Sequence, residues 1–162
     1  MEYHPVVEKI KNILVAGDCW FEMFEHEPVR TSEEAAKIRT GYNLHQGAKA
    51  IIIRVKNSES DKRFVMLVFP ADLKFDDSKV KTATNTKNIR FASEQEVSSI
   101  TGGVEVGGVP PFGNLFDLEV ITDNKLFENE KIIFNAGDRG FSIAMKSADF
   151  KKLVKPKLAE IV

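Results

Sequence analysis

The sequence predicts an α+β fold built from a mixed β-sheet and short helices. Residues 48–56 and 63–69 are nearly continuous apolar runs, as expected of central strands covered on both faces. Apolar residues at helical spacing over residues 4–16, and two capping-box sequences further along, indicate short helices. Hairpins that alternate with short helices are typical of α+β domains, and no linker interrupts residues 1–162, so we expect a single domain.

The first forty residues are expected to form two helices and a strand. Residues 4–16 read as an amphipathic helix, which Gly17 and Asp18 end. Alternation over residues 20–24 then predicts a strand. A second helix is expected from Ser32 to about Thr40, because the Thr31 hydroxyl can cap its N-terminus while Glu34 reaches back.

The rest of the chain continues with hairpins and short helices. The polar residues 57–62 join the two apolar runs as a hairpin. Residues 76–84 are a weak helix candidate, and Ser93 with Glu96 forms a capping box that opens a helix running to Ile100. The other expected elements are strands near 89–91, 118–122, 131–134 and 141–146, a last helix capped by Ser147, and a lysine-rich tail.

Composition and cysteine content predict a cytoplasmic globular protein. The hydrophobic fraction is 43% and the charged fraction 29%, both ordinary for a globular domain. The apolar runs are too short to cross a bilayer, and the first residues lack the basic and apolar regions of an export signal. Cys19 is the only cysteine and cannot form an internal disulfide, which fits a reducing compartment.

The charge distribution allows only a small contact with nucleic acid. The net charge is −1, whereas proteins that wrap long nucleic acids show a dominant basic field. Residues 1–40 carry five Lys or Arg against eight Asp or Glu, and residues 146–162 carry five Lys against two acids. The basic C-terminal tail is a candidate auxiliary contact, although a solvated helix end explains its lysines equally well.

The most informative segment is rich in glycine and proline. Residues 101–113 contain five of the ten glycines and two of the six prolines. Such a loop can present bare N–H groups at a fixed place, as an oxyanion hole requires. The alternative is an irregular turn between elements. The segment is neither a dinucleotide-binding fingerprint nor a Walker loop, because it lacks the strand and helix of the first and the Lys-Ser/Thr pair of the second.

Few other residues suggest chemistry. Lys49 shares the strand face of Ile51 and Ile53 and can extend its amine toward an anion, although a lysine at a strand end is more often an ordinary solvent-exposed residue. His26 is a candidate base or a surface residue, and Cys19 has the pattern of an inert core residue. The three histidines show no zinc-binding spacing, and no nucleophile elbow is present. Hydrolysis by this chain would therefore depend on positioning, backbone donors and the substrate's own groups.

The chain resembles the YbaK/ProX family of aminoacyl-tRNA deacylases, which is related to the editing domain of bacterial prolyl-tRNA synthetases. The specific part is Gly107-Gly108-Val109-Pro110-Pro111-Phe112-Gly113 at its distance from Lys49. The supporting segments are Phe24 to Pro28, Gly47 to Ala50, Phe69 to Asp72, Ile100 to Gly102 and Asn135 to Gly140. The resemblance extends from about Phe24 to Phe150.

The resemblance implies a barrel-like mixed sheet, a small aminoacyl pocket, and neither a metal nor a cofactor. It assigns Lys49 to the terminal adenosine or its phosphate, and the backbone of Gly107 and Gly108 to stabilising the oxyanion. The implied substrate-binding residues are Phe24, His26, Thr31, Pro70, Pro111, Gly137, Arg139 and Ser142. The implied partner is the acceptor end of an aminoacyl-tRNA, with an aminoacyl-tRNA synthetase as a second candidate and no membrane or DNA.

Two departures from the family pattern keep a second hypothesis open. Phe24 stands where some relatives have an aromatic hydroxyl, and Ala50 follows the lysine where a polar residue is frequent. These changes bear on which amino acid is removed, with tRNA-Pro carrying a small wrong amino acid as the first expectation. They also motivate the alternative of a non-catalytic module that binds the tRNA acceptor end or a synthetase.

Overall fold

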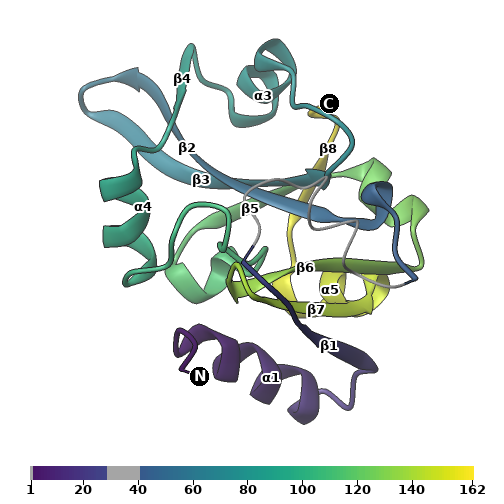
Figure 1. The fold of residues 1–162 in the computed structure, drawn as a ribbon. Helices are drawn as coiled ribbons and strands as arrows, with labels where there is room; N and C mark the ends of the chain where they lie inside the picture. Colours follow the sequence, from purple (N-terminus) through teal and green to yellow (C-terminus); the bar gives the residue numbers. More distant parts are fainter. Residues whose placement is uncertain (1, 29–40) are drawn as a thin grey trace.

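The computed structural model describes residues 2–28 and 41–162, which form two β-sheets surrounded by helices (Figure 1). The α-helices are α1 (Val6–Ala16), α3 (Asp77–Thr84), α4 (Glu94–Thr101) and α5 (Ser147–Val154). The strands are β1 (Phe21–Glu25), β2 (Ala48–Ser58), β3 (Asp61–Pro70), β4 (Asn88–Phe91), β5 (Glu119–Asp123), β6 (Lys131–Asp138), β7 (Phe141–Lys146) and β8 (Lys157–Ala159). Short 3-10 helices are η1 (Leu44–Gln46), η2 (Gly113–Phe116) and η3 (Asn124–Glu128).

The strands form two sheets that meet at one point. The five-stranded sheet has the order β4-β2-β3-β5-β8, and the three-stranded sheet has the order β1-β7-β6. The predicted hairpin of β2 and β3 is confirmed, and it forms the centre of the larger sheet. A parallel bridge between Gly47 and Ile133 connects the start of β2 to β6. The α+β class is therefore confirmed, with an open arrangement of two sheets rather than one closed barrel.

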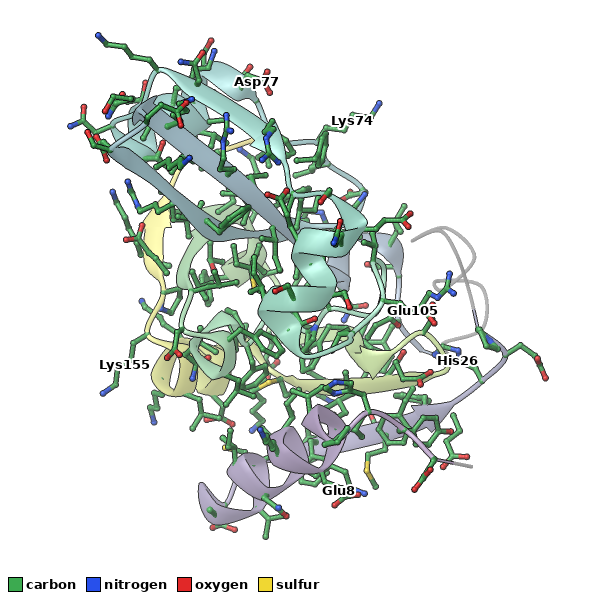
Figure 2. All side chains as sticks on the ribbon, turned by 90° about the vertical axis from the view of Figure 1, so that its left-hand side faces the viewer. Glu8, His26, Lys74, Asp77, Glu105 and Lys155 are labelled. Atoms are coloured by element: carbon green, nitrogen blue, oxygen red, sulfur yellow. The ribbon has the colours of Figure 1, made fainter. Side chains whose placement is uncertain are left out.

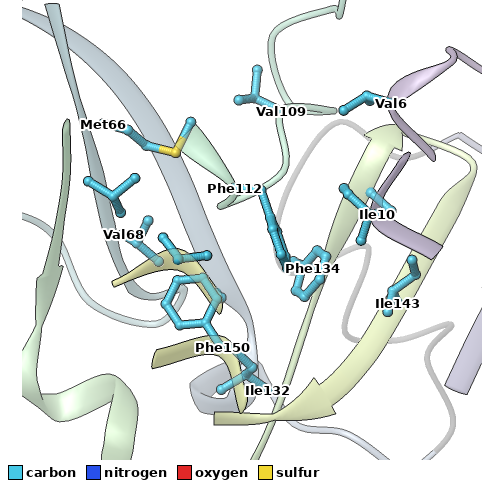
Figure 3. Packing of buried hydrophobic residues seen from close by; sticks show 14 of the residues in the cluster. Val6, Ile10, Met66, Val68, Val109, Phe112, Ile132, Phe134, Ile143 and Phe150 are labelled. Carbon is cyan, nitrogen blue, oxygen red and sulfur yellow. The ribbon is translucent and has the colours of Figure 1, made fainter. Parts of the chain in front are cut away.

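The main core joins both sheets, α1 and α5. On one face of the β2–β3 hairpin it includes Ile52, Met66 and Val68, and these pack in one cluster with residues of β6 and β7. Phe112, from the Gly/Pro segment, is fully buried in this core, and its ring lies 5.7 Å from that of Phe134 and 6.0 Å from that of Phe150 (Figure 3). The segment is therefore tied to the core by a large aromatic side chain, which restrains its backbone.

The other face of the large sheet has its own smaller core. There Ile53, Val65, Leu67 and Phe69 pack with Val80 of α3, which lies over this sheet in Figure 1. Because side chains alternate along a strand, the two faces of β2 and β3 supply two separate clusters. This confirms that both strands are covered on both faces.

Several local expectations differ from the structure. Ser147 does not cap α5: Lys146 holds the cap position, and the Ser147 hydroxyl donates to the Asn129 carbonyl at 2.6 Å. β6 extends through residues 135–138, beyond the strand expected near 131–134, because an irregularity in its pairing with β7 accommodates Gly137 at a φ of +112°. The tail forms β8, which pairs with β5.

Other expectations are confirmed or fall outside the described part. Ser93 and Glu96 form the predicted capping box of α4. The helix expected over residues 32–40 lies outside the described residues, as does Thr31. Within the described ranges, none of the helices has the length and hydrophobicity needed to span a membrane.

Candidate functional site

One row of the three-stranded sheet brings together three residues from distant parts of the chain. Phe24 of β1 is paired with Ser142 of β7, and Ser142 is paired with Asn135 of β6. Directly paired residues project to the same face of a sheet, so the three side chains share one face. Ser142 is fully buried, whereas Phe24 and Asn135 are half-buried.

Lys49 belongs to the same face. Gly47 bridges Ile133 in parallel, so two residues further along both strands Lys49 and Asn135 project to one side of the sheets. The Lys49 side chain is exposed and has no hydrogen bond or ion pair with the residues that the structure describes. An unpaired ammonium beside a polar sheet face is suited to binding an anionic group.

The Gly/Pro segment is held against the turn between β6 and β7. The Gly137 N–H donates to the Gly108 carbonyl at 2.9 Å. The Gly108 N–H donates to the Glu105 carbonyl at 2.9 Å and is therefore already engaged. By contrast, the Gly107 N–H donates to no acceptor in residues 2–28 and 41–162, and Gly107 is exposed with a φ of +92°. Of the two expected oxyanion donors, Gly107 is the one available to a ligand.

Arg139 packs beside this loop and forms an ion pair with Glu105. A Cβ built on Gly107 would lie 3.4 Å from Arg139 Cδ, so the arginine stem lies against the glycine. A shallow groove adjoins the pair and is lined by Glu94, Ser98, residues 103–106 and Arg139. Because Arg139 neutralises Glu105, Glu94 leaves the groove with a net negative charge, which suits a cationic group better than the tRNA backbone.

His26 is not the isolated surface residue that its sequence context permits. Its Nε2 lies 2.7 Å from the Ser142 hydroxyl oxygen, and its Nδ1 lies 2.9 Å from the Glu27 carbonyl. Because a carbonyl oxygen only accepts, Nδ1 carries a hydrogen. The backbone N–H of His26 donates to the Gly140 carbonyl at 3.0 Å, which places the residue directly beside the turn between β6 and β7 (Figure 2).

Two residues of this region were not assigned to the site from the sequence. Asn135 donates from Nδ2 to the Gly107 carbonyl at 2.6 Å and lies 3.3 Å, through Oδ1, from the Ser142 oxygen. Tyr42 places its ring 5.9 Å from that of Phe24 and donates its hydroxyl to Glu22 at 2.6 Å. A phenol therefore lies next to Phe24, although Phe24 itself lacks the hydroxyl.

The environment of Tyr42 keeps its hydroxyl protonated. Burial raises the pKa of Tyr42 above its usual range, and the hydrogen bond to the Glu22 carboxylate raises it further. The group can thus donate a hydrogen bond but cannot act as a base near neutral pH. No signal in the sequence separated Tyr42 from other aromatic residues, because its partner Glu22 lies twenty positions away.

The remaining expected site residues are more dispersed. Pro70 pairs with Ala48 and is buried on the core face, opposite to the face of Lys49. Pro111 is also buried, next to Phe112. In the part of the chain that the structure describes, no three His, Cys, Asp or Glu side chains group as metal ligands.

Comparisons with known proteins identify the family of this chain. The family described as the aminoacyl-tRNA editing domain matches residues 26–153. The chain is 34% identical over 139 residues to the multifunctional Ser/Thr-tRNA deacylase ProXp-y of Escherichia coli (strain K12), which covers 85% of this chain and 81% of that protein. It is 26% identical over 139 residues to the prolyl-tRNA editing protein ProX of Acetoanaerobium sticklandii. That alignment covers 83% of this chain and 82% of ProX.

A solved structure supports the same fold. A protein described as a candidate trans-editing enzyme for prolyl tRNA synthetase superposes with a TM-score of 0.80 at 20% identity, over 99% of this chain and 98% of that chain. The superposition shows that the two chains share one fold. This chain belongs to the aminoacyl-tRNA editing domain family. The expected family and the expected deacylase class are confirmed.

Proposed function

We propose that this chain acts in trans and hydrolyses the ester between a wrongly attached small amino acid and the 3′ end of a tRNA. Membership of the editing family supports the reaction, and ProX and ProXp-y, by their names, make tRNA-Pro, Ser and Thr the first substrates to test. The free cysteine supports a cytoplasmic location. A synthetase is the second candidate partner.

The observation that carries the proposal concerns two groups that have no partner among the described residues, the Lys49 ammonium and the Gly107 N–H. Lys49 is exposed on the face that also bears Asn135 and Ser142, and Asn135 in turn contacts Gly107. In the proposed complex the Lys49 ammonium binds the terminal adenosine or its phosphate. The Gly107 N–H then donates to the carbonyl oxygen of the ester, where negative charge develops during attack.

The reaction itself needs little from side chains. The oxygen of a water molecule attacks the ester carbonyl, and the bond to the ribose oxygen breaks. With water as the attacking group, the amino acid leaves as a carboxylic acid and the ribose oxygen takes up a proton. The protein contributes mainly position and an aligned donor, which explains why no nucleophile elbow is required.

The test is a deacylation assay on a panel of charged tRNAs. tRNA-Pro carrying Ser, Thr, Ala or Pro is incubated with the chain, and loss of the amino acid is followed against the rate without protein. We expect at least one mischarged tRNA to be hydrolysed and Pro-tRNA-Pro to be spared. Binding of the same tRNAs without hydrolysis of any of them would instead support the non-catalytic module.

A further inference from the structure

The peptide group that joins Gly107 to Gly108 is held by hydrogen bonds at both its carbonyl and its N–H. Its carbonyl accepts a hydrogen bond from Asn135 Nδ2 at 2.6 Å, and its N–H, which belongs to Gly108, donates to the Glu105 carbonyl at 2.9 Å. With this peptide fixed, the φ of +92° at Gly107 determines where the preceding N–H points. That N–H is the donor that the proposed function assigns to the ester carbonyl.

Asn135 is the side chain that holds this peptide. Its amide can be oriented in one way only, because a flipped amide would place Oδ1 against the Gly107 carbonyl oxygen. Its position at the end of the regular β6–β7 pairing places it on rigid sheet rather than on the loop. A donor on a sheet can therefore align a loop peptide that has no regular structure of its own.

Ser142 lies beside the other end of the amide, and His26 contacts Ser142. The Ser142 oxygen lies 3.3 Å from Asn135 Oδ1 and 2.7 Å from His26 Nε2. The single hydroxyl hydrogen of Ser142 can point to His26 or to Asn135, and the shorter contact to His26 is the stronger. Because Ser142 is fully buried, its hydroxyl acts on neighbouring side chains rather than on a bound ligand.

We propose that Asn135 is a positioning residue that aligns the Gly107 N–H with the ester carbonyl. This inference rests on the proposed function. It differs from a purely structural role because the bonded peptide adjoins the oxyanion donor across the Gly107 Cα and lies in an exposed loop rather than in the core. The consequence is an effect on the chemical step, with little effect on tRNA binding.

The experiment compares two variants that make the same chemical change. Asn135→Asp replaces the amide donor by an acceptor that cannot bond the Gly107 carbonyl. The matched control is Asn129→Asp, because Asn129 Nδ2 also donates to a backbone carbonyl, that of His45, at 3.0 Å. Single-turnover and steady-state deacylation give kcat and KM for each variant, and nitrogen–proton correlation spectra report the amides of Gly107 and Gly108 without substrate.

The expected result is a split between kcat and KM. Removing an oxyanion donor costs roughly 10²–10³-fold in kcat, and loosening one costs less, so we expect a loss of about tenfold in Asn135→Asp with KM nearly unchanged. Asn129→Asp should keep the wild-type kcat. The Gly107 and Gly108 signals should move in the first variant and stay in the second.

Three outcomes would overturn the inference. An active wild type with an unchanged kcat in Asn135→Asp removes the positioning role and leaves the proposed function intact. A change confined to KM also removes it, since the residue would then serve binding. A wild type that hydrolyses none of the panel overturns the proposed function, and the positioning role falls with it.

Discussion

Replacing Lys49 by Met tests the site most directly, because the change removes the charge and keeps most of the side-chain volume. Lys49 is exposed and forms no polar contact with the described residues, so its replacement should leave the free energy of unfolding within about 0.5 kcal/mol of wild type. A charge-assisted hydrogen bond to the substrate is worth about 1.5–3 kcal/mol. That corresponds to a loss of roughly ten- to a hundredfold in kcat/KM.

The assay is deacylation of the tRNA that the wild type hydrolyses best, at several salt concentrations. If Lys49 contacts a phosphate, removal of its charge should make the salt dependence shallower by about 0.7–0.9 in the log–log slope. Lys74→Met is the matched control, since Lys74 is also exposed and lies well apart from His26 in Figure 2. Equal kcat/KM for the two variants and the wild type, with normal unfolding midpoints, would remove Lys49 from the site.

Three further predictions concern stability and binding. Gly137→Ala should destabilise the fold by about 2–5 kcal/mol in urea unfolding, because its Cβ would lie 2.2 Å from Val6 Cγ1 at a positive φ. The control Gly102→Ala, at a positive φ in open space, should cost only about 1–2 kcal/mol, and equal losses in the two variants would refute the clash. The hydrogen bond to Asp72 raises the pKa of His45 above its usual value and Glu128 adds to this, so His45→Gln should lose most stability at pH 6, with the difference from wild type shrinking as the pH rises through the raised pKa; a difference that does not change with pH would contradict this. Uncharged tRNA should bind with a shallow salt slope of about −1.5 to −3, from two or three phosphate contacts, whereas a slope near −6 would indicate a broad phosphate footprint.

The structure also bears on the basic tail as an auxiliary contact. Lys155 lies on the opposite side of the molecule from His26 and Glu105 in Figure 2. Lys157 donates to the Ala83 carbonyl at 2.5 Å, so at least one of these lysines has a structural partner. A tRNA that reaches both the tail and the site would have to extend around the molecule, which is why we expect the shallow salt slope.

Local sequence patterns determined most of the secondary structure and part of the site. Apolar periodicity placed α1, and the capping box of Ser93 and Glu96 placed α4, because these signals act over a few neighbouring residues. Strand alternation also placed Lys49 on the face of Ile51 and Ile53, which the two separate cores confirm. The Gly/Pro segment was recognisable because its composition permits a backbone that other residues would disfavour.

Only the tertiary structure decided which of these residues meet. His26 and Ser142 are 116 positions apart, and Asn135 reaches Gly107 across 28, so no local pattern could pair them. Ser147 has the identity of a helix cap but donates to the carbonyl of Asn129, 18 positions earlier, because that long-range acceptor lies within reach. The sequence likewise allowed the Gly108 N–H to bind substrate. In the fold, this N–H donates to the Glu105 carbonyl instead. Hydrogen-bond partners depend on the distances between strands in space, and these distances are set by the packing of the whole core.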